Sequence, residues 1–373
     1  MRLLWMSDSP LACTGFGRVT REILGRLQQR PGYEVACIGW GYDGWPYDRR
    51  LIPYDICPSQ GQVFGRDAVP RAIRSFRPDV LVCFCDLWMI DWIEELPGRE
   101  TYRCVLYFPI DSGPFPPAWK PILRSADIAV TYSEFARQLA AAACPDIPIE
   151  LIYHGVDTGV FKPLDRDEIR ARHGLAGKFV VGCVARNQPR KNLPVLIKAF
   201  ARFCEGKEDA FLYLHSDPND IGWDLLDLLR RYGVDHRTCI SRLASIWNGV
   251  DDTQLNEIYN LFDLMVLPTA GEGFGLPIVE AMAAGIPVVA TDYSACVELV
   301  TGRGELIAVK EFTTAGRYNL EQALPDVEDL VAKLEGLYLD PDRRQAHRQS
   351  GLAFTRQLRW EPRIEEWVTI LSS

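Results

Sequence analysis

Short apolar runs alternate with longer amphipathic stretches along most of this chain, and this alternation limits what it can fold into. The runs that predict strands are residues 3–6, 35–39, 80–85, 104–108, 128–131, 179–185, 211–215, 239–243, 264–267, 288–290 and 306–309. Stretches with helical periodicity lie between them, such as 19–30, 68–76 and 193–205. Runs that are apolar throughout indicate parallel strands buried on both faces. The pattern therefore predicts an α/β fold built from βαβ units.

The alternation runs in two successive series, and a chain of 373 residues is long enough for two domains. Gly, Asp and Pro interrupt the pattern at residues 157–163. We therefore predict two doubly wound, Rossmann-like domains, residues 1–158 and 159–353, with ligands bound at the carboxyl ends of their strands, in a cleft that both domains face. Residues 354–371 have the apolar spacing of an amphipathic helix.

Composition excludes several classes of protein. Apolar residues make up 47% of the chain and charged residues 24%, which excludes a disordered chain, and the net charge of −9 excludes a basic nucleic-acid footprint. No apolar run approaches the length of a membrane span or resembles a signal peptide, so we expect a cytoplasmic protein, peripheral to a membrane at most. The eleven cysteines form no CxxC pair, which favours reduced thiols in the core.

The most informative motif is PTAGEGFGLPIVEAMAAGIP, at residues 268–287. It has the order of a strand end, a glycine loop and a helix. Pro277 suits a first helical position, Gly285 a carboxyl-terminal cap and Pro287 a stop, so we predict a helix over 276–284. The amino terminus of that helix, with its unpaired amides, favours an anion.

Two carboxylates lie in this motif, Glu272 in the loop and Glu280 eight residues later. Carboxylates accept hydrogen bonds from paired hydroxyls, as on ribose or hexose, so the two could hold different parts of one ligand. The alternatives are that Glu280 only compensates the helix dipole and that Glu272 is a solvated loop charge.

A basic segment, VARNQPRKN at residues 184–192, follows another predicted strand. Arg186 and Lys191 could clamp a diphosphate, because the turn at Pro189 can fold both onto one point, and Arg190 is expected to point outward. The alternative is an ordinary basic loop.

A third loop, residues 7–17, lies between the first strand and its helix. Gly15 and Gly17 permit close approach of the backbone to a phosphate or a sugar. Thr20 stands where a GxGxxG fingerprint requires glycine, and no GxxxxGK occurs, which counts against dinucleotide and P-loop sites.

At these residues the chain resembles the retaining glycosyltransferases of family 4, glycosyl transferases group 1, which have the GT-B fold. The family's Glu-x7-Glu motif stands in the context EGFGLPxxEAMAxGxPVVA, which residues 272–290 match almost throughout. Supporting matches are Arg186 and Lys191 at the family's Arg-x4-Lys spacing, HGVD at 154–157, Phe262–Asp263 and Glu298. The first 150 residues match mainly through Gly15-Phe16-Gly17.

The resemblance implies transfer of a hexose from a nucleoside-diphosphate sugar to a hydroxyl acceptor with retention, without a metal or a further cofactor. Arg186 and Lys191 would neutralise the diphosphate, and Glu280 would hold the ribose hydroxyls. Glu272 would hold the transferred sugar together with the amides of Gly273, Phe274, Gly275 and Leu276.

The resemblance also assigns roles outside the second domain. Gly15 and Gly17 would approach the phosphates from the first domain, and Asp111 would replace a histidine that family members carry near the sugar. His154 stands where asparagine is commoner, and a hinge residue without chemistry is the favoured interpretation. The final helix, residues 354–373, would pack back on the first domain.

Several readings stay open at this point. A sugar-nucleotide epimerase or hydrolase of the same fold, or a non-catalytic sugar-nucleotide sensor, would keep the same clamp, whereas a glycosidase would not need it. UDP-glucose, UDP-N-acetylglucosamine and GDP-mannose are all possible donors, with a UDP-sugar favoured. The acceptor could be a lipid-linked sugar, a glycan, a small metabolite, a protein or a modified nucleic acid.

Overall fold

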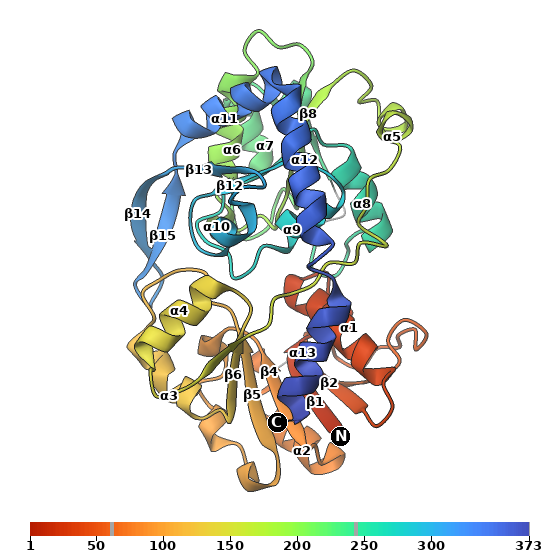
Figure 1. Cartoon of the computed structure of the whole chain (residues 1–373), viewed down its shortest axis with the longest axis vertical. Coiled ribbons are helices and arrows are strands. Elements are labelled where there is room, and N and C mark those ends of the chain that lie inside the picture. Colours follow the sequence, from red (N-terminus) through yellow and green to blue (C-terminus); the bar gives the residue numbers. More distant parts are fainter. Residues whose placement is uncertain (60–62, 242–244, 373) are drawn as a thin grey trace. The chain divides into compact units, whose positions relative to one another are not determined.

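The computed structural model describes residues 1–59, 63–241 and 245–372 of the chain. Contacts divide the chain into two compact units, Met1–Gly155 with Trp360–Ser373, and Val156–Arg359 (Figure 1). Each unit has its own parallel sheet with helices on both sides, so the α/β, doubly wound fold class is confirmed.

The first unit contains, within the described residues, a seven-stranded sheet in the order β3-β2-β1-β4-β5-β6-β7, parallel throughout. Its strands are β1 (Arg2–Asp8), β2 (Glu34–Trp40), β3 (Asp55–Pro58), β4 (Val80–Phe84), β5 (Arg103–Phe108), β6 (Ile128–Thr131) and β7 (Ile149–Leu151). Its helices are α1 (Gly15–Gln28), α2 (Ala68–Phe76), α3 (Lys120–Arg124), α4 (Glu134–Ala143) and α13 (Trp360–Ser372), with 3-10 turns η1 (Val63–Gly65), η2 (Leu87–Met89), η3 (Ile93–Glu95), η4 (Arg99–Thr101) and η5 (Pro117–Trp119). The central strands are buried on both faces, as their unbroken apolar runs predict.

The second unit contains, in the part that the structure describes, a six-stranded parallel sheet in the order β10-β9-β8-β11-β12-β13 and a separate hairpin, β14–β15. Its strands are β8 (Phe179–Val184), β9 (Ala210–His215), β10 (Thr238–Ile240), β11 (Leu264–Leu267), β12 (Val288–Thr291), β13 (Glu305–Ile307), β14 (Val309–Ala315) and β15 (Leu320–Pro325). Its helices are α5 (Arg166–Arg172), α6 (Leu193–Phe203), α7 (Leu225–Arg231), α8 (Asp252–Asn260), α9 (Leu276–Ala283), α10 (Ala295–Val300), α11 (Val327–Leu339) and α12 (Pro341–Thr355), with 3-10 turns η6 (Pro189–Lys191) and η7 (Asp235–Arg237).

The strand order places β1 and β4, and likewise β8 and β11, side by side at the centres of the two sheets. In each unit the chain returns to the sheet centre after first building outward, which makes this pair of strands the topological switch point. Loops that follow the carboxyl ends of such a pair are the usual place for a ligand in this fold.

The sequence pattern misses the edges of the sheets. Strands β3 and β7 were not predicted, because each is short, and β3 ends at a proline. The expected strand 306–309 is two elements, the end of β13 and the start of the β14–β15 hairpin. Part of the expected strand 239–243 falls outside the described residues.

The helix expected over residues 354–371 is wrong at its start. Helix α12 ends at Thr355, and α13 begins at Trp360. Pro362 explains the break, since a proline within a helix clashes with the carbonyl four residues earlier, here that of Leu358. That carbonyl instead accepts a 2.8 Å hydrogen bond from the amide of Val156. Helix α13 itself packs in the first unit beside α1 (Figure 1), burying Trp360, Ile364 and Trp367.

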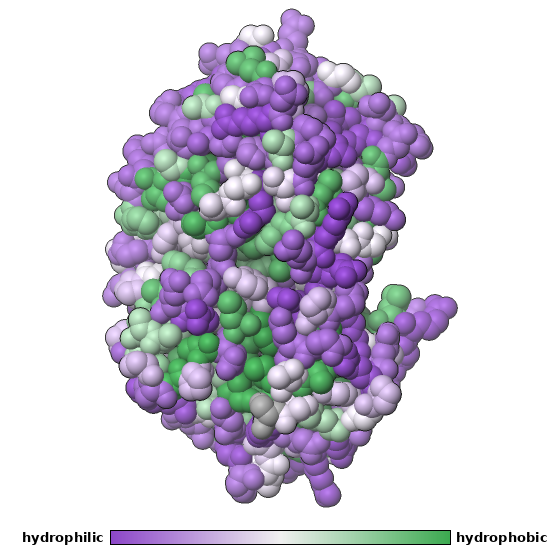
Figure 2. Space-filling model, viewed as in Figure 1, coloured by the Kyte–Doolittle hydropathy of each residue, from purple (hydrophilic) through white to green (hydrophobic). Residues whose placement is uncertain are grey.

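The surface and the cysteines agree with a globular fold. Hydrophilic residues cover most of the face shown in Figure 2, with apolar residues between them. Among the helices in the described ranges, none combines the length and apolar character required to cross a membrane. All eleven cysteines are free, and most of them are buried, as expected of core thiols.

Candidate functional site

The two motif loops of the second unit meet at the carboxyl ends of the central strands of its sheet. Residues 185–192 follow β8, residues 268–275 follow β11, and these two strands are parallel neighbours. The backbone joins the loops directly, because the amide of Ala270 donates a 2.7 Å hydrogen bond to the carbonyl of Arg190. Both loops therefore lie at the switch point of this sheet.

The glycine loop enters helix α9 as the sequence predicts, with an end one residue earlier than expected. Gly275, the residue before the helix, has φ +103°, a left-handed conformation that favours glycine. Pro277 lies in the first turn, and Gly285 beyond the last turn has φ +76°. In the loop, Phe274 and Gly275 are buried, while Gly273 and Leu276 are half-buried.

Glu272 forms a buried ion pair with the other loop. Its Oε1 lies 2.5 Å from Nζ of Lys191, and its Oε2 lies 3.4 Å from Nη1 of Arg190. The Glu272 and Lys191 side chains are only 7% and 10% exposed, so water screens this pair weakly. The interpretation of Glu272 as a solvated loop charge is therefore wrong. Arg190 was expected to point outward, yet it also donates to the carbonyl of Gly271.

The charge state of Glu272 follows from these partners. Burial raises the pKa of Glu272, but the charges of Lys191 and Arg190 and the hydrogen bond from Lys191 outweigh burial and lower it to about 2. Burial also lowers the pKa of Lys191, and the neighbouring Arg190 charge acts in the same direction. Glu272 is thus a carboxylate at neutral pH, held beside two basic side chains.

A second support of Glu272 comes from the loop after β12. The amide of Glu272 donates a 2.8 Å hydrogen bond to Oγ of the buried Ser294. Ser294 has φ +52°, which a serine rarely adopts, so the surrounding structure holds it in a strained conformation. Sequence reasoning missed Ser294, because its signal is a backbone conformation rather than a motif.

Arg186 forms an ion pair with Asp220. Its Nε and Nη2 lie 2.6 and 3.1 Å from the two carboxylate oxygens of Asp220, in the loop after β9. The side chain of Arg186 is 37% exposed and that of Asp220 is 18% exposed. It stays a prediction that the turn at Pro189 folds Arg186 and Lys191 onto one point. The structure adds Asp220 as an acidic partner of Arg186, which sequence reasoning did not assign.

Glu280 lies in the second turn of α9 and is buried. Its Oε2 accepts a 2.8 Å hydrogen bond from the hydroxyl of Tyr259, in α8. Tyr259 is fully buried as well, which fixes the carboxylate from one side. The helix dipole acts mainly within the first turn, so it stabilises this carboxylate less than one at the start of the helix, and the role of Glu280 stays a prediction. Glu298 is half-buried in α10.

Two supporting motif residues have structural roles. Asp263 holds Arg166 at 2.9 Å and Arg170 at 2.6 Å, and it accepts a hydrogen bond from the amide of Val180. It thus ties α5 to the start of β8. In the first unit, His154 is buried with its Nδ1 2.9 Å from the hydroxyl of Tyr107, and burial lowers its pKa to about 3.

The remaining predicted residues lie in the first unit. Gly15 and Gly17 are in the first turn of α1, where Thr14 caps the helix by accepting a 3.0 Å bond from the amide of Gly17. A Cβ on Gly17 would lie 2.6 Å from the carbonyls of Ser9 and Ala12, so glycine is needed there for packing within its own loop. Asp111 follows β5 and is half-buried, and its catalytic role stays a prediction.

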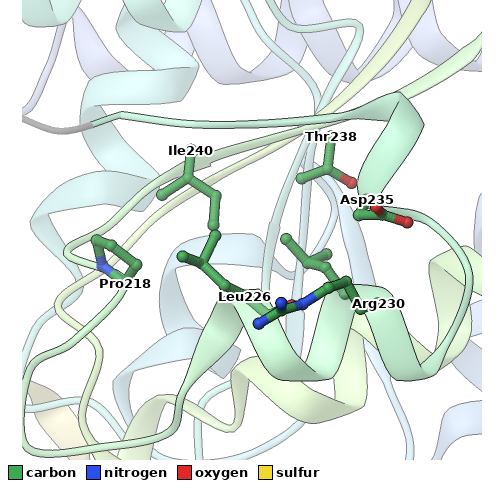
Figure 3. A pocket seen from close by; sticks show the side chains of 7 residues that line it. Pro218, Leu226, Arg230, Asp235, Thr238 and Ile240 are labelled. Atoms are coloured by element: carbon green, nitrogen blue, oxygen red, sulfur yellow. The ribbon is translucent and has the colours of Figure 1, made fainter.

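A pocket in the second unit contains none of the predicted residues. Figure 3 shows it between α7 and the edge strand β10, lined by Pro218, Leu226, Leu229, Arg230, Asp235, Thr238 and Ile240. Over the described residues, no three His, Cys, Asp or Glu side chains gather as metal ligands would. The predicted site residues of this unit lie instead in the loops after β8 and β11 and in α9, and the carboxylate partner of Arg186 lies in the loop after β9.

Comparison with protein families identifies residues 178–338, which match the family described as glycosyl transferases group 1. The lipopolysaccharide core biosynthesis mannosyltransferase LpsB of Rhizobium meliloti is 34% identical over 171 residues, 44% of this chain and 46% of that protein. A GDP-mannose-dependent alpha-(1-6)-phosphatidylinositol monomannoside mannosyltransferase of Mycobacterium tuberculosis is 28% identical over 260 residues, 66% of this chain and 62% of that protein. The chain thus spans about half to three fifths of the length of these relatives.

Solved structures support the fold over the whole chain. Sucrose-phosphate synthase from Thermosynechococcus elongatus has a TM-score of 0.77 at 17% identity and covers 99% of this chain and 98% of its own. Anabaena HepE in complex with UDP-glucose has a TM-score of 0.75 at 19% identity and covers 100% of this chain and 99% of its own. At these identities the likeness shows the fold, which is the GT-B fold.

Proposed function

We propose that this chain, which belongs through residues 178–338 to the glycosyl transferases group 1, transfers a hexose from a nucleoside-diphosphate sugar to a hydroxyl acceptor with retention. The observation that carries the proposal is the buried carboxylate of Glu272, held by Lys191 and Arg190 where the glycine loop enters α9. Basic side chains, loop amides and a carboxylate at one strand edge suit a ligand that combines phosphate with hydroxyl groups.

The proposed mechanism places each group where charge develops. When the sugar leaves, negative charge grows on the diphosphate, and Arg186 and Lys191 would stabilise it. Loss of one such contact commonly lowers the rate by about 10²-fold or more. Glu272 and the amides of residues 273–276 would orient the sugar, and Glu280 would accept from the ribose hydroxyls. The acceptor would attack on the face that the phosphate leaves, and that phosphate would take the acceptor's proton, so the mechanism needs no protein nucleophile. Arg186 and Lys191 would carry the phosphate charge in place of a metal ion.

The roles of the first unit and the identity of the substrates are part of the proposal. Asp111, Gly15 and Gly17 are proposed to meet the sugar and phosphates from the acceptor side. A UDP-sugar is the favoured donor. One similar solved structure holds UDP-glucose, whereas the name of one relative specifies GDP-mannose. Acceptors of the lipid-linked sugar or glycan class are favoured, since two relatives are named for lipopolysaccharide core and phosphatidylinositol mannoside synthesis.

Titration with nucleotides tests the proposal. The purified chain is titrated with UDP, GDP, ADP and their sugar conjugates by calorimetry and thermal shift, with Arg186→Ala and Glu280→Ala as variants. Ligand at 100 times its Kd stabilises a protein by about 2.7 kcal/mol, which a thermal shift resolves. Arg317→Ala, at an exposed arginine in the turn of the β14–β15 hairpin, is the matched control.

The expected result is binding of one nucleotide series, with a strongly raised Kd in both site variants and an unchanged Kd in the control. Absence of binding to every nucleoside diphosphate would overturn the proposal and favour a glycosidase. Product analysis with and without acceptor then separates the enzyme classes: transfer requires acceptor, hydrolysis or epimerisation does not, and a sensor shows no turnover.

A further inference from the structure

The loop after β9 is fastened to the residue next to Arg186. The side chain of Asn187 accepts a 3.0 Å hydrogen bond from the amide of Trp223, and donates 2.7 and 3.3 Å bonds to the carbonyls of Trp223 and Pro218. The carbonyl of Asn187 also accepts a 3.0 Å bond from the amide of Gly222. Asn187 is fully buried, so these bonds hold residues 218–223 firmly against the end of β8.

Gly222 allows this close approach. A Cβ at this position would lie 2.2 Å from Oδ1 of Asn187, nearer than any real Cβ contact. A residue with a side chain at position 222 would therefore push the loop away from Asn187. Asp220 lies in the middle of this fastened segment.

A backbone hydrogen bond orients the side chain of Asp220 independently of Arg186. Its Oδ1 accepts a 2.8 Å bond from the amide of Ile221, while its two oxygens take Nε and Nη2 of Arg186. A carboxylate that accepts from both Nε and Nη2 fixes the plane of the guanidinium. The Nη1–Nη2 edge then points in one direction, along which an anion would approach. Because Asp220 accepts these bonds as an anion, its pKa is lowered, first by the Arg186 hydrogen bond.

We infer that Asp220 is a positioning residue, which acts through Arg186 to aim the guanidinium at the diphosphate of the donor. The inference rests on the proposed function. The fastened loop makes displacement of Asp220 by the ligand unfavourable, so Asp220 stays paired while the donor is bound. At metal sites, outer partners that orient a ligand commonly contribute about 10- to 100-fold in affinity or activity, and an effect of the same order is expected for Asp220.

The test is a double-mutant cycle on nucleotide binding by the full chain. Calorimetry with UDP and with GDP measures Kd for the wild type, Asp220→Asn, Arg186→Ala and the double variant. Asp217→Asn is the matched control, because Asp217 is a half-buried carboxylate of the same loop. Its Oδ1 accepts a 3.0 Å bond from the amide of Asn219, which an asparagine side chain can also accept. Thermal unfolding of each variant reports on folding.

Asp220→Asn is expected to raise Kd about 10-fold or more in the wild-type background. In the Arg186→Ala background the same substitution should not raise Kd further. The melting temperature of Asp220→Asn should stay close to that of Asp217→Asn. An equal loss in both backgrounds would mean a role that does not pass through Arg186 and would overturn the inference. Tighter binding by Asp220→Asn would show that Asp220 competes with the diphosphate, which overturns it too. If the wild type binds neither nucleotide, both the proposed function and the inference fail. If Asp220→Asn binds as tightly as the wild type, only the inference fails.

Discussion

Lys191 and Glu272 stand 81 positions apart in the chain and form an ion pair of 2.5 Å between two loops of one sheet edge. Both side chains are almost completely removed from water. A buried pair of this kind contributes little net stability compared with apolar residues, whereas the loss of one partner leaves a charge that is expensive to keep. Net stability therefore does not account for the pair, which agrees with the binding role proposed for both residues.

Lys191→Met is predicted to destabilise the second unit by about 3 kcal/mol. Glu272 would keep the 3.4 Å contact with Arg190 and a hydrogen bond from Thr269, and its buried charge would be less well compensated. Denaturation in urea, followed by tryptophan fluorescence, measures the change. A loss below about 1 kcal/mol, the size of an exposed pair, would mean that water reaches this carboxylate.

The double variant Lys191→Met with Glu272→Gln separates stability from function. Both charges are removed together, so stability should return to within about 1 kcal/mol of the wild type. Nucleotide binding should not return, because the cation for the diphosphate is still missing. If the double variant were as unstable as the sum of the single changes, packing rather than charge would explain the loss.

The central strands and the site motif could be predicted from the sequence, because both depend on local signals. The runs around residues 80–85 and 264–267 are apolar without interruption. Gly275 and Gly285 mark the ends of α9 through positive φ angles that other residues adopt poorly, and Pro277 marks its first turn through its fixed φ and missing amide hydrogen. The edge strand β7 carries no such signal, since its three residues are exposed or half-buried.

The partners of the site residues could not be predicted, because they depend on contacts between distant segments. Asp220 reaches Arg186 only after β9 has paired beside β8, and Tyr259 reaches Glu280 only after α8 has packed on α9. The outward direction expected for Arg190 failed for the same reason. Arg190 contacts the carbonyl of Gly271 and the carboxylate of Glu272, which belong to another loop and cannot be inferred from residues 184–192 alone.

Tyr259→Phe is predicted to lower the free energy of unfolding by about 1–3 kcal/mol, because the buried Oε2 of Glu280 loses its hydroxyl donor. Nucleotide affinity should fall as well, by less than in Glu280→Gln, since the carboxylate remains but is less well oriented. Urea denaturation and calorimetry on the same preparations measure both effects. Stability loss with unchanged affinity would indicate that this bond serves the core alone.

Gly275→Ala is predicted to cost about 2 kcal/mol, more than Gly302→Ala in the same unit. Both glycines have a positive φ, +103° and +76°, so alanine is strained at either position. Only at Gly275 would the new Cβ meet a neighbour, Cδ1 of Ile278 at 3.0 Å, whereas the space at Gly302 is open. Because Gly275 leads into α9, its variant should also weaken nucleotide binding, measured by calorimetry, and Gly302→Ala should not. Equal losses of stability would mean that strain alone matters.

His154→Gln is predicted to flatten the decline of stability in acid. The pKa of His154 is lowered to about 3 by burial, against 6.5 in the unfolded chain. Between these values the unfolded state holds a proton that the folded state lacks, so the unfolding free energy of the wild type falls as pH decreases from 6.5 toward 3. One such group contributes a slope of about 1.4 kcal/mol per pH unit between pH 5.5 and 4. Urea denaturation at pH 7, 5.5 and 4 should show a wild-type slope steeper by roughly this amount than that of the variant, whatever the variant loses in absolute stability through its contact with Tyr107. Equal slopes would mean that His154 takes up a proton within the folded first unit, which its burial and its 2.9 Å contact with the Tyr107 hydroxyl oppose.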